Sequence, residues 1–246
     1  MFHLMTSDFR KVVEIYAKDN PKLLDKEWRL SKKSGLYWIK GKDGKPVLFE
    51  PNWAQIELLK DPHPLKIIPK SRQLGVTTFY AINYIDDCIF NETPIDTTFI
   101  ADRRENAELI FENKVKFAWE RMPDWVTKLN PASKDSTRML RWANGSSYVV
   151  DTAPRGGTFQ RLHISEFGKI CAKYPAKAQE IIEGALETVA IGQQVTIEST
   201  SEGRGGYFYD ICKQAQEKAV KGEEPGEMDY KLFFFPWWKE STYTLN

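Results

Sequence analysis

The chain has 246 residues, and its 35 Lys and Arg nearly balance its 34 Asp and Glu, leaving a formal net charge of +1 at pH 7. Hydrophobic residues make up 41% and charged residues 28%, which excludes wholesale disorder, collagen and coiled coil. The length suits one large α/β domain or two small ones. Because the overall charge indicates no polyanionic partner, any nucleic-acid contact must come from a local basic patch.

The spacing of the cysteines and the length of the apolar segments predict where in the cell the protein is found. Cys88, Cys171 and Cys212 are scattered and form no CxxC pair, which predicts free thiols in a reducing environment. The longest apolar stretch, Leu232–Trp238, is far shorter than the ~20 residues of a membrane span. The first residues interrupt their apolar positions with charges before a signal-peptide core can form. We therefore expect a soluble, cytosolic protein.

The N-terminal part predicts a short helix and then a hairpin. Asp8–Ala17 has an apolar stripe at helical spacing, and Leu36–Lys40 alternates opposite Val47–Glu50 across a KDGK turn. Basic residues are dense in this region: Arg29, Lys32, Lys33, Lys40, Lys42 and Lys45. They make the hairpin a candidate DNA contact, with an ordinary solvated surface as an equal alternative.

From Leu65 onward, the pattern alternates between strand and helix. The predicted strands are Leu65–Pro69, Thr97–Ala101, Leu162–Ser165, Val195–Ser199 and Tyr230–Phe235, with a hairpin at Met139–Thr152. The predicted helices are Thr77–Phe90, Arg103–Arg121, Ala176–Ala190 and Tyr207–Val220. This alternation is typical of a mostly parallel sheet, in which ligands bind at the carboxyl ends of the strands. The loops after Pro69, Ser165 and Ser199 are thus the expected site.

The loop after the first of these strands is a candidate phosphate-binding loop. In the standard motif G-x-x-x-x-G-K-[ST], backbone N–H groups hold phosphates and the hydroxyl reaches Mg²⁺. Gly75 and Thr77 match it, whereas Lys70 stands at the first glycine and Val76 at the lysine. Lys70 and Arg72 can restore the missing charge from the other end of the loop. A basic loop before a helix is the alternative. The expected phosphate-binding residues are Lys70, Ser71, Arg72, Gln73, Leu74, Gly75, Val76, Thr77 and Thr78.

SRQLG followed by one residue and TT resembles the P-loop of the large terminase subunit, the DNA-packaging motor of tailed phages and herpesviruses. The resemblance extends from about Tyr37 to Trp238, and a lysine at the start of the loop is a variant that this family uses. It implies an α/β P-loop NTPase fold of the RecA-like (ASCE) class, with ATP and Mg²⁺ as ligands. In the segment PNWAQIELL, it implies that Trp53 and Gln55 hold adenine.

RLHISEFGK resembles the Walker B segment of the same family. The resemblance implies that Glu166 orients and activates the attacking water. Ser165 stands where the family has an aspartate associated with Mg²⁺, so the expected metal residues are Thr77, Ser165 and Glu166. A serine brings no charge, which predicts weaker metal binding or slower turnover.

Two further segments match the family more loosely. IESTSEGRGGYF resembles its coupling motif, which would give Ser199 and Thr200 the role of sensing the γ-phosphate; a flexible Ser/Gly loop is the alternative. APRGGT presents Arg155 where some terminases carry a trans-acting arginine finger. The expected catalytic residues are therefore Glu166, Arg155, Lys70 and Arg72, with Arg204 as a further candidate finger.

The resemblance implies ATP-driven translocation of double-stranded DNA into a procapsid in the host cytoplasm. The implied partners are the portal protein, the small terminase subunit and further copies of the chain in a ring, pentameric on the capsid. Residues 1–206 would form the ATPase core with an N-terminal extension, and residues 207–246 a lid-like subdomain. The family's nuclease domain has no room here, so we expect an isolated ATPase domain.

Two other functions stay open at this stage. A helicase-type ATPase fits the adenine-side glutamine and the strand order, although the chain lacks room for a second RecA-like domain. A degenerate P-loop scaffold that binds nucleotide or DNA without turnover fits Val76 and Ser165, where a lysine and an aspartate are missing.

Overall fold

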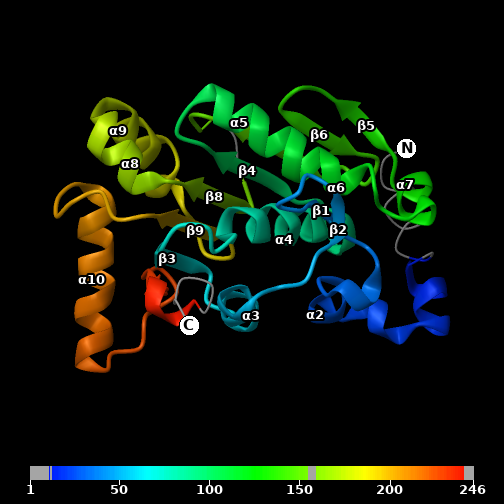
Figure 1. Cartoon of the computed structure of the whole chain (residues 1–246), viewed down its shortest axis with the longest axis horizontal. Coiled ribbons are helices and arrows are strands. Elements are labelled where there is room, and N and C mark those ends of the chain that lie inside the picture. The colour runs from blue at the N-terminus through cyan, green and yellow to red at the C-terminus, as the bar shows by residue number, and fades with distance from the viewer. Residues whose placement is uncertain (1–10, 12, 155–158, 241–246) are drawn as a thin grey trace.

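A computed structural model describes residues 11, 13–154 and 159–240. Among these residues, eight strands form one central sheet in the order β10-β3-β9-β8-β4-β7-β6-β5 (Figure 1). Neighbours from β10 to β7 are parallel, and β6 and β5 extend the sheet antiparallel. The strands are β3 (Leu65–Pro69), β4 (Asp96–Ile100), β5 (Ala132–Asp135), β6 (Met139–Trp142), β7 (Ser147–Asp151), β8 (Arg161–Ser165), β9 (Gln194–Ser199) and β10 (Lys231–Leu232).

Helices and a small separate hairpin surround this sheet. The hairpin pairs β1 (Trp38–Lys40) with β2 (Pro46–Leu48). The α-helices are α2 (Lys26–Arg29), α3 (Trp53–Lys60), α4 (Val76–Phe90), α5 (Arg104–Ile110), α6 (Phe117–Trp119), α7 (Asp124–Leu129), α8 (Phe167–Lys173), α9 (Pro175–Gly184) and α10 (Tyr207–Lys221). The other helical turns are η1 (Pro21–Leu24), η2 (Lys32–Ser34), η3 (Phe111–Lys116, π-helical), η4 (Leu186–Thr188) and η5 (Trp237–Lys239). Within the described part of the chain, no helix is long and apolar enough to cross a membrane.

The sheet separates two hydrophobic cores. Strand side chains alternate between its faces, so Ile197 and Ile164 pack into the core of α8, α9 and α10. Ile68 and Phe99 pack into the other core with α4 and the α5–η3–α6 helix. The face toward α4 also carries buried polar side chains, among them Glu198. Helices therefore cover both faces, and the carboxyl ends of the parallel strands share one edge.

The fold confirms the predicted alternation of strands and helices, with a few differences. The helix expected at Arg103–Arg121 is interrupted by the π-helical η3. Ala107, Phe111 and Val115 are spaced four residues apart and are all fully buried. Because a π-helical turn contains more residues than an α-helical turn, it keeps residues at this spacing on one side of the helix. The short helix α8 was not predicted. The helix expected at Asp8–Ala17 lies partly outside the described residues, and residues 13–19 are helical.

The segment expected to form a lid-like subdomain is joined to the central sheet. β10 pairs parallel with β3 at its edge, and Phe235 forms a further bridge with Lys70. α10 packs on α8 and β3 (Figure 1). The described part of residues 207–246 thus supports the strand that leads into the candidate P-loop, and its role as a lid stays a prediction.

One residue of the predicted basic patch is not available to DNA. Arg29 is buried and makes two hydrogen bonds to the Asp86 carboxylate of α4, at 2.8 Å from Nε and 2.7 Å from Nη2. The Tyr37 hydroxyl donates to the same carboxylate at 2.8 Å. The patch prediction was wrong for Arg29, because this positive charge fastens the N-terminal segment to the core helix.

We expect Asp86→Ala to lower the free energy of unfolding by about 3–5 kcal/mol, because it leaves the Arg29 guanidinium buried without its partner. Urea unfolding followed by tryptophan fluorescence measures this. Asp124→Ala, which removes an exposed ion pair with Lys128, is the control and should leave the midpoint unchanged. Equal midpoints for the two variants would contradict the structural role of Asp86.

Candidate functional site

The three loops singled out from the sequence meet at the carboxyl edge of the sheet. β9 lies between β3 and β8, with Pro69 opposite Ser199 and Ser165 opposite Glu198. One hollow there is lined by Lys70, Arg72, Gln73, Glu166, Lys169 and Thr200. An adjoining hollow is lined by Thr77, Thr78, Asp102, Asn106, Lys114 and Ser165. The tertiary structure thus gathers candidates that are up to 130 positions apart in the sequence into one region.

The loop between β3 and α4 has the backbone of a tight anion-binding turn. Gly75 has φ +68° and caps the N-terminus of α4, and Gln73 has φ +59°. A Cβ at position 75 would lie 2.7 Å from Nε2 of Gln55, so the turn requires glycine for both its angle and its packing. The free N–H groups at the start of α4 add positive potential, which suits a phosphate.

The N-terminus of α3 holds this loop in place. Nε2 of Gln55 donates to the carbonyl oxygens of Gly75 at 3.0 Å and Leu74 at 3.3 Å, and Asn52 Nδ2 also donates to Leu74 at 3.0 Å. Oε1 of Gln55 accepts from the Asn52 backbone N–H. The Gln55 amide expected to hold adenine is therefore bound to the protein's own backbone, and it sets the position of the P-loop.

Trp53, the other residue expected at adenine, is half-buried at the start of α3. Its Nε1 donates to Glu240 at 3.0 Å, and its ring meets Phe235 edge to face at a centroid distance of 5.5 Å. These contacts connect α3 to the segment after β10. Contact of Trp53 with a base stays a prediction.

Lys70 lies at the centre of the site. Its side chain is 7% exposed, and Nζ is 3.1 Å from Oε2 of Glu198 and 3.4 Å from Oε1 of Glu166. Although burial disfavours the ammonium ion, the two carboxylates raise the pKa of Lys70 above its usual value. Lys70 therefore carries a fixed positive charge beside the turn at Gly75.

Glu198 is a residue of the site that sequence reasoning missed. Its carboxylate is fully buried, and Oε1 accepts hydrogen bonds from Thr77 Oγ1 at 2.7 Å and Ser165 Oγ at 2.8 Å. Burial alone would raise the pKa of Glu198, but His163, Lys70 and Thr77 together lower it to about 2. One feature of the sequence could have indicated Glu198: it is a charged residue within Val195–Ser199, a strand predicted to be buried.

Glu166 occupies the turn from β8 into α8. Its φ is +57°, a left-handed conformation that is strained for a side chain with a Cβ and that is often found at functional sites. Its Oε1 faces Lys70, and its Oε2 accepts from Thr200 Oγ1 at 3.4 Å. The side chain is 31% exposed, so a carboxylate reaches the hollow beside a cation.

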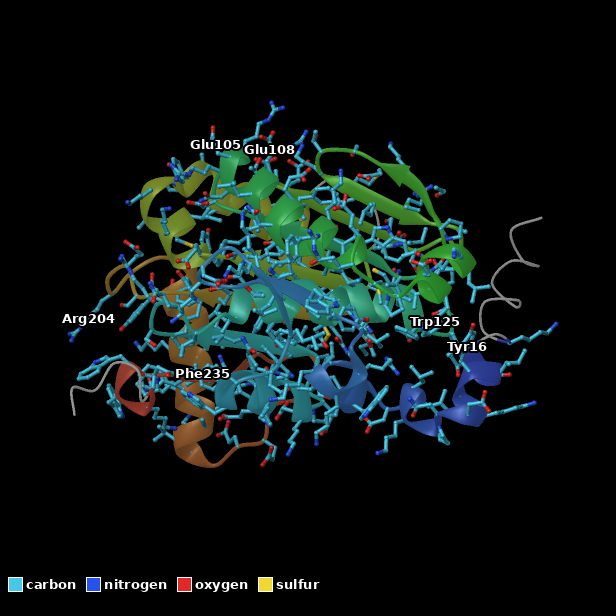
Figure 2. All side chains as sticks on the ribbon, turned by 45° about the vertical axis from the view of Figure 1, so that its right-hand side comes forward. Tyr16, Glu105, Glu108, Trp125, Arg204 and Phe235 are labelled. Carbon is cyan, nitrogen blue, oxygen red and sulfur yellow. The ribbon has the colours of Figure 1, made fainter. Side chains whose placement is uncertain are left out.

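The remaining candidate residues lie away from the cluster around Lys70 or at its rim. Ser199 lies on the sheet face toward α8, where a Cβ on Gly168 would be 2.9 Å from its hydroxyl, and its carbonyl oxygen accepts from the Lys70 N–H. Arg72 is exposed at the rim. Figure 2 shows Arg204 pointing outward from the molecule. Arg155 lies outside the described residues.

Lys114 on the π-helical η3 is a second residue that was not predicted. Its Nζ donates to Thr78 Oγ1 at 2.7 Å, beside the start of α4. Burial lowers the pKa of Lys114, against the opposing effect of Glu198. The π-helical turn thus brings a second ammonium group to the P-loop helix.

The donors at this site fit Mg²⁺ bound together with a nucleotide. Mg²⁺ prefers oxygen ligands and is usually held by one or two carboxylates together with substrate phosphates. Thr77 and Ser165 supply two hydroxyls, and both contact the carboxylate of Glu198. The described residues contain no cluster of three or more His, Cys, Asp or Glu that would form a site by themselves.

Comparison with known proteins assigns the fold. No protein-family model and no curated protein sequence matches the chain. The ATPase domain of the Thermus phage P74-26 large terminase superposes with a TM-score of 0.54 at 14% identity, covering 78% of this chain and 83% of that domain. The HK97 bacteriophage large terminase superposes with a TM-score of 0.60 at 12% identity, over 86% of this chain and 43% of that protein. The chain therefore has the α/β P-loop fold of phage large terminase ATPase domains, as the motifs predicted.

Alanine at position 75 tests the packing of the P-loop turn. Gly222 has a similar φ of +71° but open space around it, whereas a methyl group at position 75 displaces Gln55. We expect Gly222→Ala to cost about 1 kcal/mol of unfolding free energy through its backbone angle alone, and Gly75→Ala roughly 2–3 kcal/mol. Urea unfolding measures both costs, and equal costs would contradict the close packing of Gln55.

The carboxylate of Glu198 should make stability depend on pH. Because the pKa of Glu198 is about 2 in the folded chain and higher when unfolded, its ionised form stabilises the native state above about pH 4.3. That stabilisation is lost as the pH falls toward 2. From about pH 6 to about pH 3, wild type should lose about 2 kcal/mol more unfolding free energy than Glu198→Gln. Urea titrations at each pH measure this, and parallel pH profiles would contradict it.

Proposed function

We propose that this chain is the ATPase domain of a large terminase subunit, which hydrolyses ATP to move double-stranded DNA into a procapsid. The observation that carries the proposal is the convergence of the Lys70 ammonium, the Thr77 hydroxyl and the Glu166 carboxylate in one hollow. This hollow lies at the carboxyl edge of the sheet in a fold shared with phage large terminase ATPase domains.

In this proposal, residues 70–78 bind the phosphates of ATP. The N–H groups around Gly75 and at the start of α4 would contact the phosphate oxygens, while Lys70 turns from its carboxylate partners toward the same charge. Arg72 would add a second cation from the rim. Thr77 and Ser165 would hold Mg²⁺, which would supply positive charge to the phosphates.

Glu166 is proposed to position the attacking water and accept its proton. The water oxygen bonds to the γ-phosphorus while the bond from phosphorus to the β–γ bridging oxygen breaks, releasing ADP and phosphate. Catalysis of this reaction depends mainly on positioning and charge, so a carboxylate and a lysine 3.4 Å apart suit it. Arg155 of a neighbouring copy would stabilise the charge on the transferring group.

The hydrogen bond from Thr200 to Glu166 offers a route for coupling hydrolysis to movement. Departure of the γ-phosphate would change the surroundings of Glu166, and Thr200 connects that residue to the glycine-containing segment before α10. The proposed partners are double-stranded DNA, the portal protein, the small terminase subunit and further copies of the chain in a ring. The proposed compartment is the host cytoplasm.

Glu166→Gln tests the assigned chemistry. We expect the variant to bind ATP with Mg²⁺ about as well as wild type, and to lose at least about a hundredfold in phosphate release, because an amide cannot take the proton. The assay uses high protein concentration, so that a trans-acting arginine can reach a neighbouring site. Glu105→Gln, on the exposed surface of α5 in Figure 2, is the control and should keep full activity.

Lys70→Ala tests nucleotide binding in the same assay. Loss of this cation should weaken binding and turnover together, whereas Lys213→Ala on the exposed surface of α10 should alter neither. If wild type binds nucleotide or DNA and releases no phosphate at any concentration, the chain is a scaffold. Hydrolysis stimulated by free nucleic acid, and independent of portal protein, would instead support a helicase-type ATPase.

A further inference from the structure

We infer that Glu198 supplies the carboxylate that holds Mg²⁺ at this site, in place of the acidic residue that β8 lacks. The inference rests on the proposed function, because it concerns the metal bound with ATP. It assigns to β9 a role that P-loop ATPases ordinarily give to an aspartate on the Walker B strand.

The position of Glu198 relative to the P-loop hydroxyl supports this assignment. In P-loop NTPases, Mg²⁺ is held by the P-loop Ser or Thr together with the Walker B aspartate. Here the serine at that aspartate's position contacts Glu198 at 2.8 Å, and the P-loop hydroxyl of Thr77 contacts the same oxygen at 2.7 Å. The Glu198 carboxylate therefore comes from β9, the strand next to the Walker B position on β8, and it still contacts the Thr77 hydroxyl.

The register of the sheet makes this displacement possible. Ser165 and Glu198 are paired across β8 and β9, and both side chains lie on the face toward α4. Neighbouring parallel strands are ~4.8 Å apart, a gap that the longer glutamate side chain can span. Serine at position 165 leaves space for that carboxylate and donates a hydrogen bond to it.

Charge balance gives the second line of support. A fully buried carboxylate is costly unless a cation accompanies it, and Lys70 is that cation at 3.1 Å. Apart from this ion pair, Oε2 of Glu198 accepts no hydrogen bond from the described part of the chain. When Lys70 turns toward phosphate, Glu198 loses its closest cation, and Mg²⁺ bound beside Thr77 would replace that charge.

Glu198 as a structural counter-ion for Lys70 is the competing explanation. It predicts that removing the carboxylate alters nucleotide binding equally with and without metal. Our inference predicts that removing the carboxylate reduces only the part of the nucleotide affinity that depends on Mg²⁺. The quantity that separates the two is the factor by which Mg²⁺ tightens nucleotide binding.

The experiment measures the dissociation constant of a fluorescent ATP analogue in EDTA and across a Mg²⁺ titration. For wild type, we expect Mg²⁺ to tighten binding, and for Glu198→Gln we expect that factor to fall about tenfold or more. Glu217→Gln is the matched control, because Glu217 is exposed on α10 and far from the P-loop in the chain. Its Mg²⁺ factor should equal that of wild type.

A double variant that places the carboxylate on β8 instead of β9 tests whether the charge itself is what holds the metal. Ser165→Asp combined with Glu198→Gln exchanges the acidic and the uncharged residue across the paired strands. If Glu198 acts through its charge on the metal, the double variant should recover most of the Mg²⁺ factor. If Glu198→Gln does not fold by circular dichroism, Glu198→Ala replaces it: a reduced factor supports the inference, and an unchanged factor overturns it.

The outcomes separate the inference from the proposal beneath it. If wild type binds no nucleotide with or without Mg²⁺, the proposed function fails. If wild type shows Mg²⁺-dependent binding and a folded Glu198→Gln retains it, only the assignment of Glu198 fails. An equal loss of binding in EDTA and in Mg²⁺ would also overturn it, in favour of the counter-ion role.

Discussion

The buried ion pair between Glu198 and Lys70 is the constraint around which the candidate site is arranged. A carboxylate without solvent exposure, flanked by strands on both sides, needs a cation and hydrogen-bond donors from the surrounding elements. Lys70 approaches from the end of β3, Thr77 from α4 and Ser165 from β8. The three connections that could bind a nucleotide thus meet at one negative charge.

The two faces of the sheet are chemically unlike, and this difference follows from how each is covered. The face under α8 and α10 is filled by aliphatic side chains such as Ile164 and Ile197. The face under α4 carries His163, Thr196 and Glu198, with the Tyr84 hydroxyl contacting Thr196. Polar groups at this depth need partners, and α4 provides them for Thr196, through the Tyr84 hydroxyl, and for Glu198, through the Thr77 hydroxyl. The helix that begins at the P-loop is therefore fixed to the sheet by polar contacts as well as by apolar packing.

Much of the candidate site was accessible from local sequence patterns and from the resemblance of two motifs to a known family. Lys70, Gly75, Thr77 and Glu166 were expected at the carboxyl ends of strands, and the structure brings them into adjoining hollows. The contacts of Gln55 with the P-loop were not accessible from the sequence: its amide donates to carbonyl oxygens of Leu74 and Gly75, and its pairing with a base stays a prediction. Glu198 was missed because its one local signal, a charged residue within a strand predicted to be buried, does not by itself indicate a function. Its partners come from other strands and from α4.

By itself, the sequence determined the alternation of strands and helices and the position of the candidate phosphate-binding loop between a strand and a helix. These features depend on periodicity and on turn chemistry, which neighbouring residues decide. The resemblance of RLHISEFGK to a Walker B segment added that an acidic residue is missing before Glu166. Only the tertiary structure decided which strand supplies the missing carboxylate. Ser165 and Glu198 are 33 positions apart, and they meet because parallel pairing of β8 with β9 sets their register and points both toward α4. Such pairing depends on the whole sheet, and no local pattern encodes it.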